Sequence, residues 1–256
     1  MKFAVCIKQV PTREWQPRID ETKRGVREQD ASFEMNEPDA YALEEALRLR
    51  EKHGGEVVVC TAGPSRASQV LREALARGAD RGIHVEDDRL ASITTDPFVV
   101  AGALADAVRE EQFDLVLTGL QSDDQGAAQT GVILAEKLGL PHATIVMDVQ
   151  VQGAELRVKR ELEGGWFQWV QMPLPALLTI QSGINQLRYA TLKGIMAAKK
   201  KDIRKVMPAS LHAAHTGVAG FDIPRKSKQT QLITGSAAEA AKALVAKLKD
   251  EARVIE

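Results

Sequence analysis

The sequence predicts an α/β protein built on a doubly wound, mostly parallel sheet, with an antiparallel β addition and an extended C-terminal arm. In residues 1–140, short apolar runs typical of buried strands alternate with stretches of helical spacing. After Pro141 the pattern changes to short β-rich runs separated by Gly and Pro. The chain then ends in an aperiodic stretch and one amphipathic segment, which predicts the arm.

The apolar run Phe3–Ile7 predicts the first, central strand, and Pro11 closes it. Residues 12–35 are polar and poorly periodic, so we expect a long excursion that holds a small hairpin near Gly25. Asn36 precedes a helical pattern that ends at His53, which makes Asn36 a good N-cap. Asn36 either caps this helix only, or marks a helix start that faces a ligand crevice.

The run Glu56–Thr61 predicts a second buried strand, and Gly63-Pro64-Ser65 turns it into a helix that ends near Arg77. This turn lacks the G-x-G-x-x-G fingerprint, so an independent dinucleotide site of the Rossmann type is not supported. Arg81–Val85 predicts a short strand, and Asp96-Pro97 starts another helix as N-cap and first residue.

The most informative stretch runs from Phe113 to Leu140. Its apolar start ends at Gly119, a polar loop follows, and Ala127 opens a helical pattern whose apolar face packs back on the sheet. The first turn of that helix, near residues 128–130, directs unpaired N–H groups at the loop, and such a terminus is an anion site.

Most strand–loop–helix crossovers in α/β proteins bind no ligand, so the residue types of this loop must indicate whether it binds one. Gly126 and Gly131 admit a ligand, and Gln125, Gln129 and Thr130 offer side-chain donors, which favours a nucleotide or phosphate group. The neighbouring acids Asp123 and Asp124 oppose it, because they repel phosphate unless a cation or a ribose hydroxyl engages them.

Beyond Pro141, four short runs predict the antiparallel addition: Val146–Val151, Glu155–Arg160, Trp166–Val170 and Ala176–Ile180. Ser182–Gly194 is expected to be a loop, and the basic run that follows it, through Lys205, a solvated face. Residues 207–234 predict an arm, and Ser236-Ala-Ala-Glu239 is a capping box that opens a final helix. We therefore divide the chain into 1–206 and 207–256.

Composition bounds the possible functions. The 256 residues are 44% hydrophobic and 27% charged with a net charge of −1, which is typical of a globular protein and argues against a nucleic-acid partner. No apolar run approaches the roughly 20 residues of a membrane span, and Met1-Lys2 leads directly into a strand. We expect a cytoplasmic protein with no direct membrane insertion, whose Cys6 and Cys60 are buried free thiols.

The five histidines give no zinc spacing, and His212 and His215 are expected to form a surface pair. No Ser/His/Asp, Cys/His or metal constellation is visible, so we expect no enzyme.

Several stretches resemble the small (beta) subunit of electron-transfer flavoproteins. One is VKRELEGGWFQWVQMPLPALLT from Val158 to Thr179, and another is RYATL from Arg188 to Leu192, followed by Ile195-Met196 and the lysines 199–201. Asn36 with Glu44-Glu45-Ala46, residues 78–85 and the loop that ends Gln129-Thr130-Gly131 are similar to that family as well. The resemblance extends from near the amino terminus to about Lys201.

The resemblance implies an adenine nucleotide alpha-hydrolase-like fold and a heterodimer, in which a larger alpha subunit holds most of an FAD and packs against the C-terminal arm. It also implies a buried AMP with a structural role. Carried over by position, the cofactor-binding residues are Cys6, Asn36, Glu37, Pro38, Asp39, Ala62, Gly119, Leu120, Gln121, Ser122, Asp123, Asp124, Gln125, Gly126, Ala127, Ala128, Gln129 and Thr130.

One departure concerns Ala128, where many family members have Asn. The amide contact is lost while the backbone donor remains, so we expect weakened phosphate binding. In bifurcating relatives a second FAD occupies this pocket; a clear G-D-T-A-Q-V-G pattern is absent here, which favours AMP.

Residues 180–201 resemble the family's recognition loop, with Leu192 as the apolar anchor and Arg188 and Tyr189 beside it. The resemblance implies electron transfer from flavin dehydrogenases, such as the acyl-CoA dehydrogenases of fatty acid oxidation, to a membrane quinone oxidoreductase, in the mitochondrial matrix if the source is eukaryotic. Two rivals remain: a nucleotide sensor of the universal-stress type, and an ATP-cleaving enzyme, which would need an S-G-G-x-D-S loop where Lys8-Gln9-Val10-Pro11 stands.

Overall fold

The computed structural model describes residues 1–90, 93–224 and 230–255. Its strands are β1 (Lys2–Cys6), β2 (Gln9–Pro11), β3 (Phe33–Met35), β4 (Glu56–Gly63), β5 (Arg81–Glu86), β6 (Leu115–Gly119), β7 (His142–Gln152), β8 (Glu155–Glu161), β9 (Phe167–Pro173), β10 (Ala176–Ile180) and β11 (Ile203–Val206). Its helices are α1 (Glu37–His53), α2 (Ser68–Arg77), α3 (Pro97–Val108), α4 (Thr130–Leu138), α5 (Leu192–Ala198) and α6 (Ala237–Ala246).

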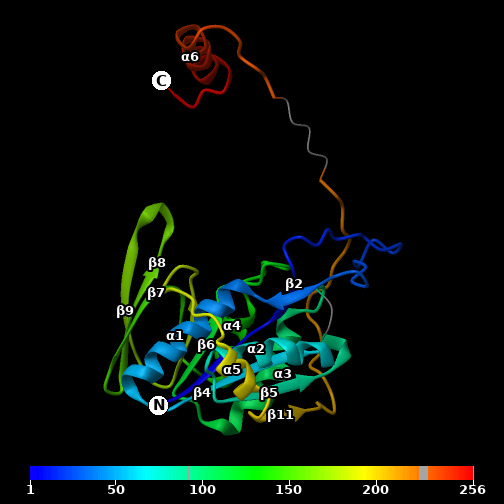
Figure 1. Cartoon of the computed structure of the whole chain (residues 1–256), viewed down its shortest axis with the longest axis vertical. Helices are drawn as coiled ribbons and strands as arrows, with labels where there is room; N and C mark the ends of the chain where they lie inside the picture. The colour runs from blue at the N-terminus through cyan, green and yellow to red at the C-terminus, as the bar shows by residue number, and fades with distance from the viewer. Residues whose placement is uncertain (91–92, 225–229, 256) are drawn as a thin grey trace. The chain divides into compact units, whose positions relative to one another are not determined.

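The chain divides into two compact units, Met1–Phe221 and Asp222–Glu256. The first is built on a nine-stranded sheet in the order β11-β5-β4-β1-β6-β10-β7-β8-β9 (Figure 1). β1 pairs in parallel with β4 on one side and with β6 on the other, so the direction of winding reverses between β1 and β6. The expected doubly wound, mostly parallel α/β fold is confirmed.

The two faces of the sheet carry separate apolar layers, because alternate residues of a strand point to opposite sides. Phe3 and Val5 of β1 pack into a cluster with Leu43 and Leu47 of α1 and with α2. Ala4 and Cys6 pack on the other face, in a cluster that includes residues of α3 and α4. Cys6 and Cys60 are opposite one another on β1 and β4 and are buried free thiols, as expected.

Two strand assignments from the sequence were wrong. Ala176–Ile180, expected in the antiparallel addition, is the parallel strand β10 between β6 and β7, and only β7, β8 and β9 pair antiparallel. All five residues of β10 are buried, which is typical of a strand inside a parallel sheet. Strand β11, at the other edge, was missed because IRKV is short and lies in the basic run.

Two helix assignments also need correction. Helix α4 begins at Thr130 and not at Ala127, so residues 127–129 belong to the loop. The predicted loop Ser182–Gly194 ends earlier, at Thr191, because helix α5 begins at Leu192. The Thr191 side chain caps this helix by accepting a hydrogen bond from the Gly194 N–H.

Several local predictions were correct. Asp96 caps α3 by accepting a hydrogen bond from the Phe98 N–H. Inside the excursion, Ile19 and Val26 form an isolated antiparallel bridge, and the Asp20 N–H donates to Gly25 O at its turn. The strands β2 and β3 at the two ends of the excursion also pair antiparallel. His212 and His215 are exposed and pack edge-on against Phe98.

In the unit Asp222–Glu256, Ser236 and Glu239 form the predicted capping box of α6. None of the described residues of this unit is buried. Over the three described ranges, the helices lack the length and apolar composition that a bilayer span requires.

Candidate functional site

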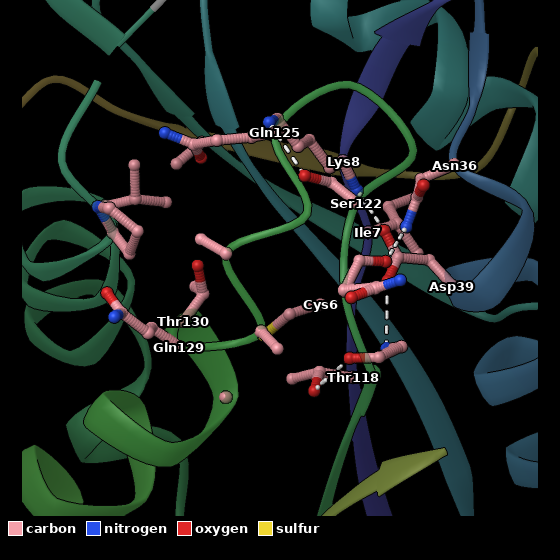
Figure 2. A pocket seen from close by; sticks show the side chains of 18 of the residues that line it. Cys6, Ile7, Lys8, Asn36, Asp39, Thr118, Ser122, Gln125, Gln129 and Thr130 are labelled. Carbon is pink, nitrogen blue, oxygen red and sulfur yellow. Dashed lines mark hydrogen bonds between the residues drawn. The ribbon is translucent and has the colours of Figure 1, made fainter. Parts of the chain in front are cut away.

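A pocket lies at the carboxyl ends of β1 and β6, next to the start of α4 (Figure 2). This is the point where the winding of the sheet reverses, at which ligands of doubly wound proteins bind. Its empty space, including the part open to solvent, is about 780 Å³. Figure 2 shows Gln129 and Thr130 on one side of the pocket and Asn36 and Asp39 on the other.

Asp39, in the first turn of α1, joins the two strands that end at the pocket. Its carboxylate accepts hydrogen bonds from the Lys8 N–H at 2.7 Å and from the Gly119 N–H at 2.8 Å. Burial raises the pKa of Asp39 to about 6, and the hydrogen bonds from these two N–H groups act in the opposite direction. A β-carbon at Gly119 would lie 2.5 Å from Asp39 Oδ1, so only glycine permits this approach.

Asn36 stands at the predicted N-cap position of α1, but its side chain makes no cap hydrogen bond, so the position was correct and the expected capping by the side chain was wrong. Its amide instead spans to the loop after β6: Nδ2 donates to Gln121 O at 3.0 Å, and Oδ1 accepts from the Asp123 N–H at 2.9 Å. Asn36 is almost fully buried. It therefore ties the start of α1 to the loop, which agrees with the alternative that the helix start faces the crevice.

The acids that argued against an anion are paired within the chain. Lys8 Nζ contacts Asp124 Oδ1 at 2.7 Å and Ser122 Oγ at 3.3 Å. Arg13 forms an ion pair with Glu37 and lies 3.6 Å from Asp123 Oδ2. Because Lys8 and Arg13 lie beside these acids, the repulsion that the acids exert on a phosphate is reduced.

The start of α4 offers backbone donors to the pocket. Ala128 has φ of +54°, and the helix begins two residues later. The first N–H groups of a helix have no intrahelical acceptor, and within the described residues none is paired with those of Gln129 and Thr130. Gly131 brings the helix close to β6, since a β-carbon there would lie 2.6 Å from Thr118 Oγ1.

Thirteen of the expected cofactor-binding residues line this pocket: Cys6, Asn36, Asp39, Ala62, Gly119, Leu120, Gln121, Ser122, Gln125, Ala127, Ala128, Gln129 and Thr130. The other five, Glu37, Pro38, Asp123, Asp124 and Gly126, are not part of its lining. Their contact with a cofactor stays a prediction, as it does for the thirteen.

Sequence analysis missed the wall formed by residues before and within α3. Leu90, Thr95, Pro97, Val100 and Leu104 line the pocket. Gln125 Nε2 donates to Thr95 O at 3.1 Å and links the loop to this wall. The only available signal was that the Asp96-Pro97 helix start follows a strand, as the start of α4 does.

The expected docking residues lie elsewhere in the same unit. Leu192 is 84% exposed and Tyr189 is 91% exposed. Arg188 is not a free cation, because it forms ion pairs with Glu44 and Glu51. The basic run is not only a solvated face: Lys201 Nζ donates to the carbonyl oxygens of Leu75 and Ala79.

The fold and the pocket together define a doubly wound α/β protein whose site lies at the carboxyl edge of the sheet, where the winding reverses between β1 and β6. The described site residues offer backbone donors and apolar surface, which suit the binding of a ligand.

Comparison with known proteins identifies the family. Residues 24–211 match the family model described as electron transfer flavoprotein domain. The chain is 38% identical to the "Electron transfer flavoprotein subunit beta" of Methylophilus methylotrophus, over 96% of this chain and 97% of that protein. It is 36% identical to the protein of that name from Homo sapiens, over 99% of each chain.

The chain therefore belongs to the electron transfer flavoprotein family, and its similarity to the beta subunits extends over nearly its full length. Members of this family are electron carriers and not enzymes, and the beta-subunit name implies a second subunit. A relative from Oryza sativa, 38% identical over 100% of each chain, is named as the mitochondrial subunit beta.

Proposed function

We propose that this chain is the small subunit of a two-chain electron carrier and that it encloses a structural AMP in the pocket beside α4. A larger alpha subunit holds most of an FAD, to whose surroundings this chain contributes. The observation that carries the proposal is the pocket itself, in which N–H groups of Gln129 and Thr130 have no acceptor among the described residues while the nearby acids are paired with Lys8 and Arg13.

The pocket suits an adenylate in two respects. Unpaired N–H groups at a helix start bind phosphate, because the partial positive charge of the helix dipole lies there. Cys6, Ala62 and Val100 supply apolar surface for a purine ring. A second FAD in the same pocket is the alternative, as is a sensor that binds the nucleotide without a partner.

Exposed apolar surface supports a partner subunit. On β9 and beside it, Trp166 is 75% exposed, and Phe167 and Trp169 are each more than 40% exposed. In α6, Leu244 and Val245 are about half exposed. Apolar surface of this kind marks protein interfaces, so we assign both regions to contact with the alpha subunit.

The exposed Leu192 supports a second, transient contact. Leu192 lies among the exposed side chains of Tyr189, Ile195 and Met196. A small exposed apolar group near cationic residues offers a hot spot with electrostatic steering, which suits fast and weak encounters. In this proposal Leu192 docks on flavin dehydrogenases such as acyl-CoA dehydrogenases, and a membrane quinone oxidoreductase takes the electrons. The carrier works in the cytoplasm, or in the mitochondrial matrix if the source is eukaryotic.

The central experiment is coexpression of this chain with the candidate alpha subunit encoded by a neighbouring gene. We expect a flavin spectrum that requires both chains, and one AMP per heterodimer after acid extraction. Ala128→Glu should expel the nucleotide and impair assembly, because its carboxylate lies at the phosphate position, whereas Ala128→Asn is the control that keeps it. Unchanged nucleotide content in Ala128→Glu contradicts the site.

The same preparation separates the rivals. A chain that purifies alone, colourless and with bound nucleotide supports the sensor, and magnesium-dependent ATP turnover by the single chain supports the hydrolase. Two moles of FAD per heterodimer and no AMP support the bifurcating alternative.

Leu192→Ala tests donor docking. We expect slower electron acceptance from an acyl-CoA dehydrogenase reduced by its substrate, with flavin content unchanged. Met207→Ala is the matched control, since Met207 is 79% exposed and lies outside the loop. Equal rates for Leu192→Ala and the unmodified carrier refute the docking role.

A further inference from the structure

The segment that carries Leu192 is anchored at both ends to different helices of the first unit. Upstream, Asn185 and Arg188 bind α1, and downstream, Lys201 and the end of α5 bind α2. The residues between the anchors are among the most exposed apolar side chains of the unit, at 91% for Tyr189 and 84% for Leu192.

The upstream anchor is the pair of Arg188 and Glu44. Glu44 Oε2 accepts from Arg188 Nε at 2.7 Å and from the Arg188 N–H at 3.2 Å, and Oε1 accepts from Nη2 at 2.9 Å. Glu44 is 6% exposed, on the buried side of α1. The remaining guanidinium nitrogen, Nη1, donates to the exposed Glu51 at 2.6 Å.

The carboxylate of Glu44 therefore binds the side chain and the backbone of the same residue. A fork of this kind fixes the direction in which the chain leaves Arg188, because a bidentate guanidinium–carboxylate pair has one planar geometry. The Glu44 and Glu51 carboxylates raise the pKa of Arg188 further above its ordinary value, so its charge is retained at every relevant pH.

Glu45, the next residue of α1, also contacts this segment. Asn185 Nδ2 donates to Glu45 Oε2 at 3.0 Å and to Tyr41 O at 3.1 Å. Burial raises the pKa of Glu45, and the hydrogen bond from Asn185 lowers it in part. Two buried acids on one helix thus have their contacts in the segment 185–188.

The downstream anchor packs α5 tightly on α2. Arg72 Nη1 donates to Ala198 O at 2.6 Å and to Lys201 O at 2.9 Å. A β-carbon at Gly194 would lie 2.2 Å from Ala76 O, so the two helices touch through backbone. With both ends held, α5 presents Leu192 and Met196 outward from a fixed base.

We propose that Glu44 and Arg188 form a positioning pair that holds Leu192 in its docking geometry before the donor protein arrives. This inference rests on the proposed docking function of Leu192 and deepens it. Neither residue contacts the donor in this proposal; each acts through the backbone between Arg188 and Leu192. Preorganisation strengthens binding because the segment then loses little conformational freedom on association.

The test uses the flavin-loaded heterodimer, with an acyl-CoA dehydrogenase reduced by its substrate as the electron donor. Arg188→Gln removes the charge and the bidentate fork. We expect its KM for the donor to rise roughly tenfold while kcat, flavin content and dithionite reduction stay unchanged. Arg188→Lys, which keeps the charge without the fork, should give an intermediate KM.

The matched control is Arg77→Gln, which breaks the ion pair of Arg77 with Glu73 within α2 and leaves the Arg188–Glu44 pair intact. Its KM should equal that of the unmodified carrier. Hydrogen–deuterium exchange of amides 186–198 gives a second measurement, and it should accelerate in Arg188→Gln and not in Arg77→Gln. If Arg188→Gln assembles poorly, Glu44→Gln is measured instead, because it preserves shape and one acceptor.

The outcomes separate this inference from the function on which it rests. An Arg188→Gln carrier with unchanged KM and unchanged exchange overturns the positioning pair, even if Leu192→Ala remains slow. Faster exchange with unchanged KM also overturns it, because the segment would then be loose without consequence for docking. If Leu192→Ala itself is as fast as the unmodified carrier, the docking function fails first.

Discussion

The pocket and the Leu192 segment are both held by acidic residues of α1, in contrasting ways. Asp39, in the first turn, binds the neutral N–H groups of Lys8 and Gly119 inside the protein. Glu44 binds a guanidinium that is partly exposed to solvent. One helix therefore serves a concave site whose polar groups are enclosed and a convex site whose apolar groups are displayed.

The difference shows which conditions should disturb each region. A buried carboxylate with only neutral donors feels the cost of its own charge, so its region responds to pH. An ion pair near the surface is stabilised by Coulomb attraction, so its region responds to salt. The following experiments would break or sharpen this contrast.

The largest effect is expected for Asp39→Ala. Removing this carboxylate leaves two enclosed backbone N–H groups without an acceptor, which costs roughly 4 kcal/mol of unfolding free energy at one to three per group. Urea denaturation measures it. Asp39→Asn retains one acceptor oxygen and serves as the control, with a smaller loss. Equal stability of Asp39→Ala and the unmodified chain would remove Asp39 as the link between β1 and β6.

A pH series should show the next effect. The pKa of Asp39 is raised from 3.8 to about 6 on folding. The folded state therefore holds this proton more tightly than the unfolded state, and the free energy of unfolding falls as pH rises from about 4 to about 6, by about 3 kcal/mol in total.

The Asp39 contribution is constant above and below that window. In Asp39→Asn this component of the pH profile should be missing, which isolates it from the other titrating groups. If the unmodified protein and Asp39→Asn show the same slope, the pKa of Asp39 is not raised in the folded protein.

A smaller effect is expected at the Leu192 segment, where Arg188 has one buried and one exposed partner. Glu44→Gln should lower the unfolding free energy by roughly 1–2 kcal/mol and Glu51→Gln by less than about 0.5 kcal/mol, because exposed ion pairs contribute little. High salt should make the loss caused by Glu44→Gln smaller than it is at low salt, because salt screens the ion pair. If Glu44→Gln and Glu51→Gln lose the same unfolding free energy, the buried ion pair of Arg188 is no stronger than the exposed one.

The smallest effect is a gain. Ala128 has a positive φ, which costs a residue with a β-carbon about 1 kcal/mol. Ala128→Gly should recover most of this free energy, and Ala128→Asn part of it, since Asn tolerates the left-handed region. Thermal unfolding of the nucleotide-free chain measures both. A loss of stability in both variants would show that the loop does not keep this conformation in solution.

Much of the fold could be predicted from residue patterns. The strand at residues 3–7, the helix that ends at His53, the Asp96 cap and the Ser236 capping box all lie where local rules placed them. Each depends on neighbours within a few residues, such as the cap Ser236 and its box partner Glu239, three residues apart. The polar loop before α4 was found in the same way, since it follows a buried strand directly.

The errors share a different origin. Asn36 has the residue type and position of a cap, yet its amide binds Gln121 and Asp123, more than 80 residues away. Ala176–Ile180 has the short β-rich pattern of its neighbours, but its pairing with β6 depends on which strand lies beside it. The partner of Arg188 was not predicted at all, because Glu44 lies 144 residues away in the sequence.

The amino-acid sequence by itself determined the alternation of strands and helices, the buried thiols and the polar loop that opens α4, because periodicity and local caps depend on nearby residues only. The tertiary structure alone decided which acids are paired, which cations pair with them and which donors of the described residues remain unsatisfied. These properties depend on distances of about 3 Å between groups far apart in the chain, and burial alters the strength of such contacts.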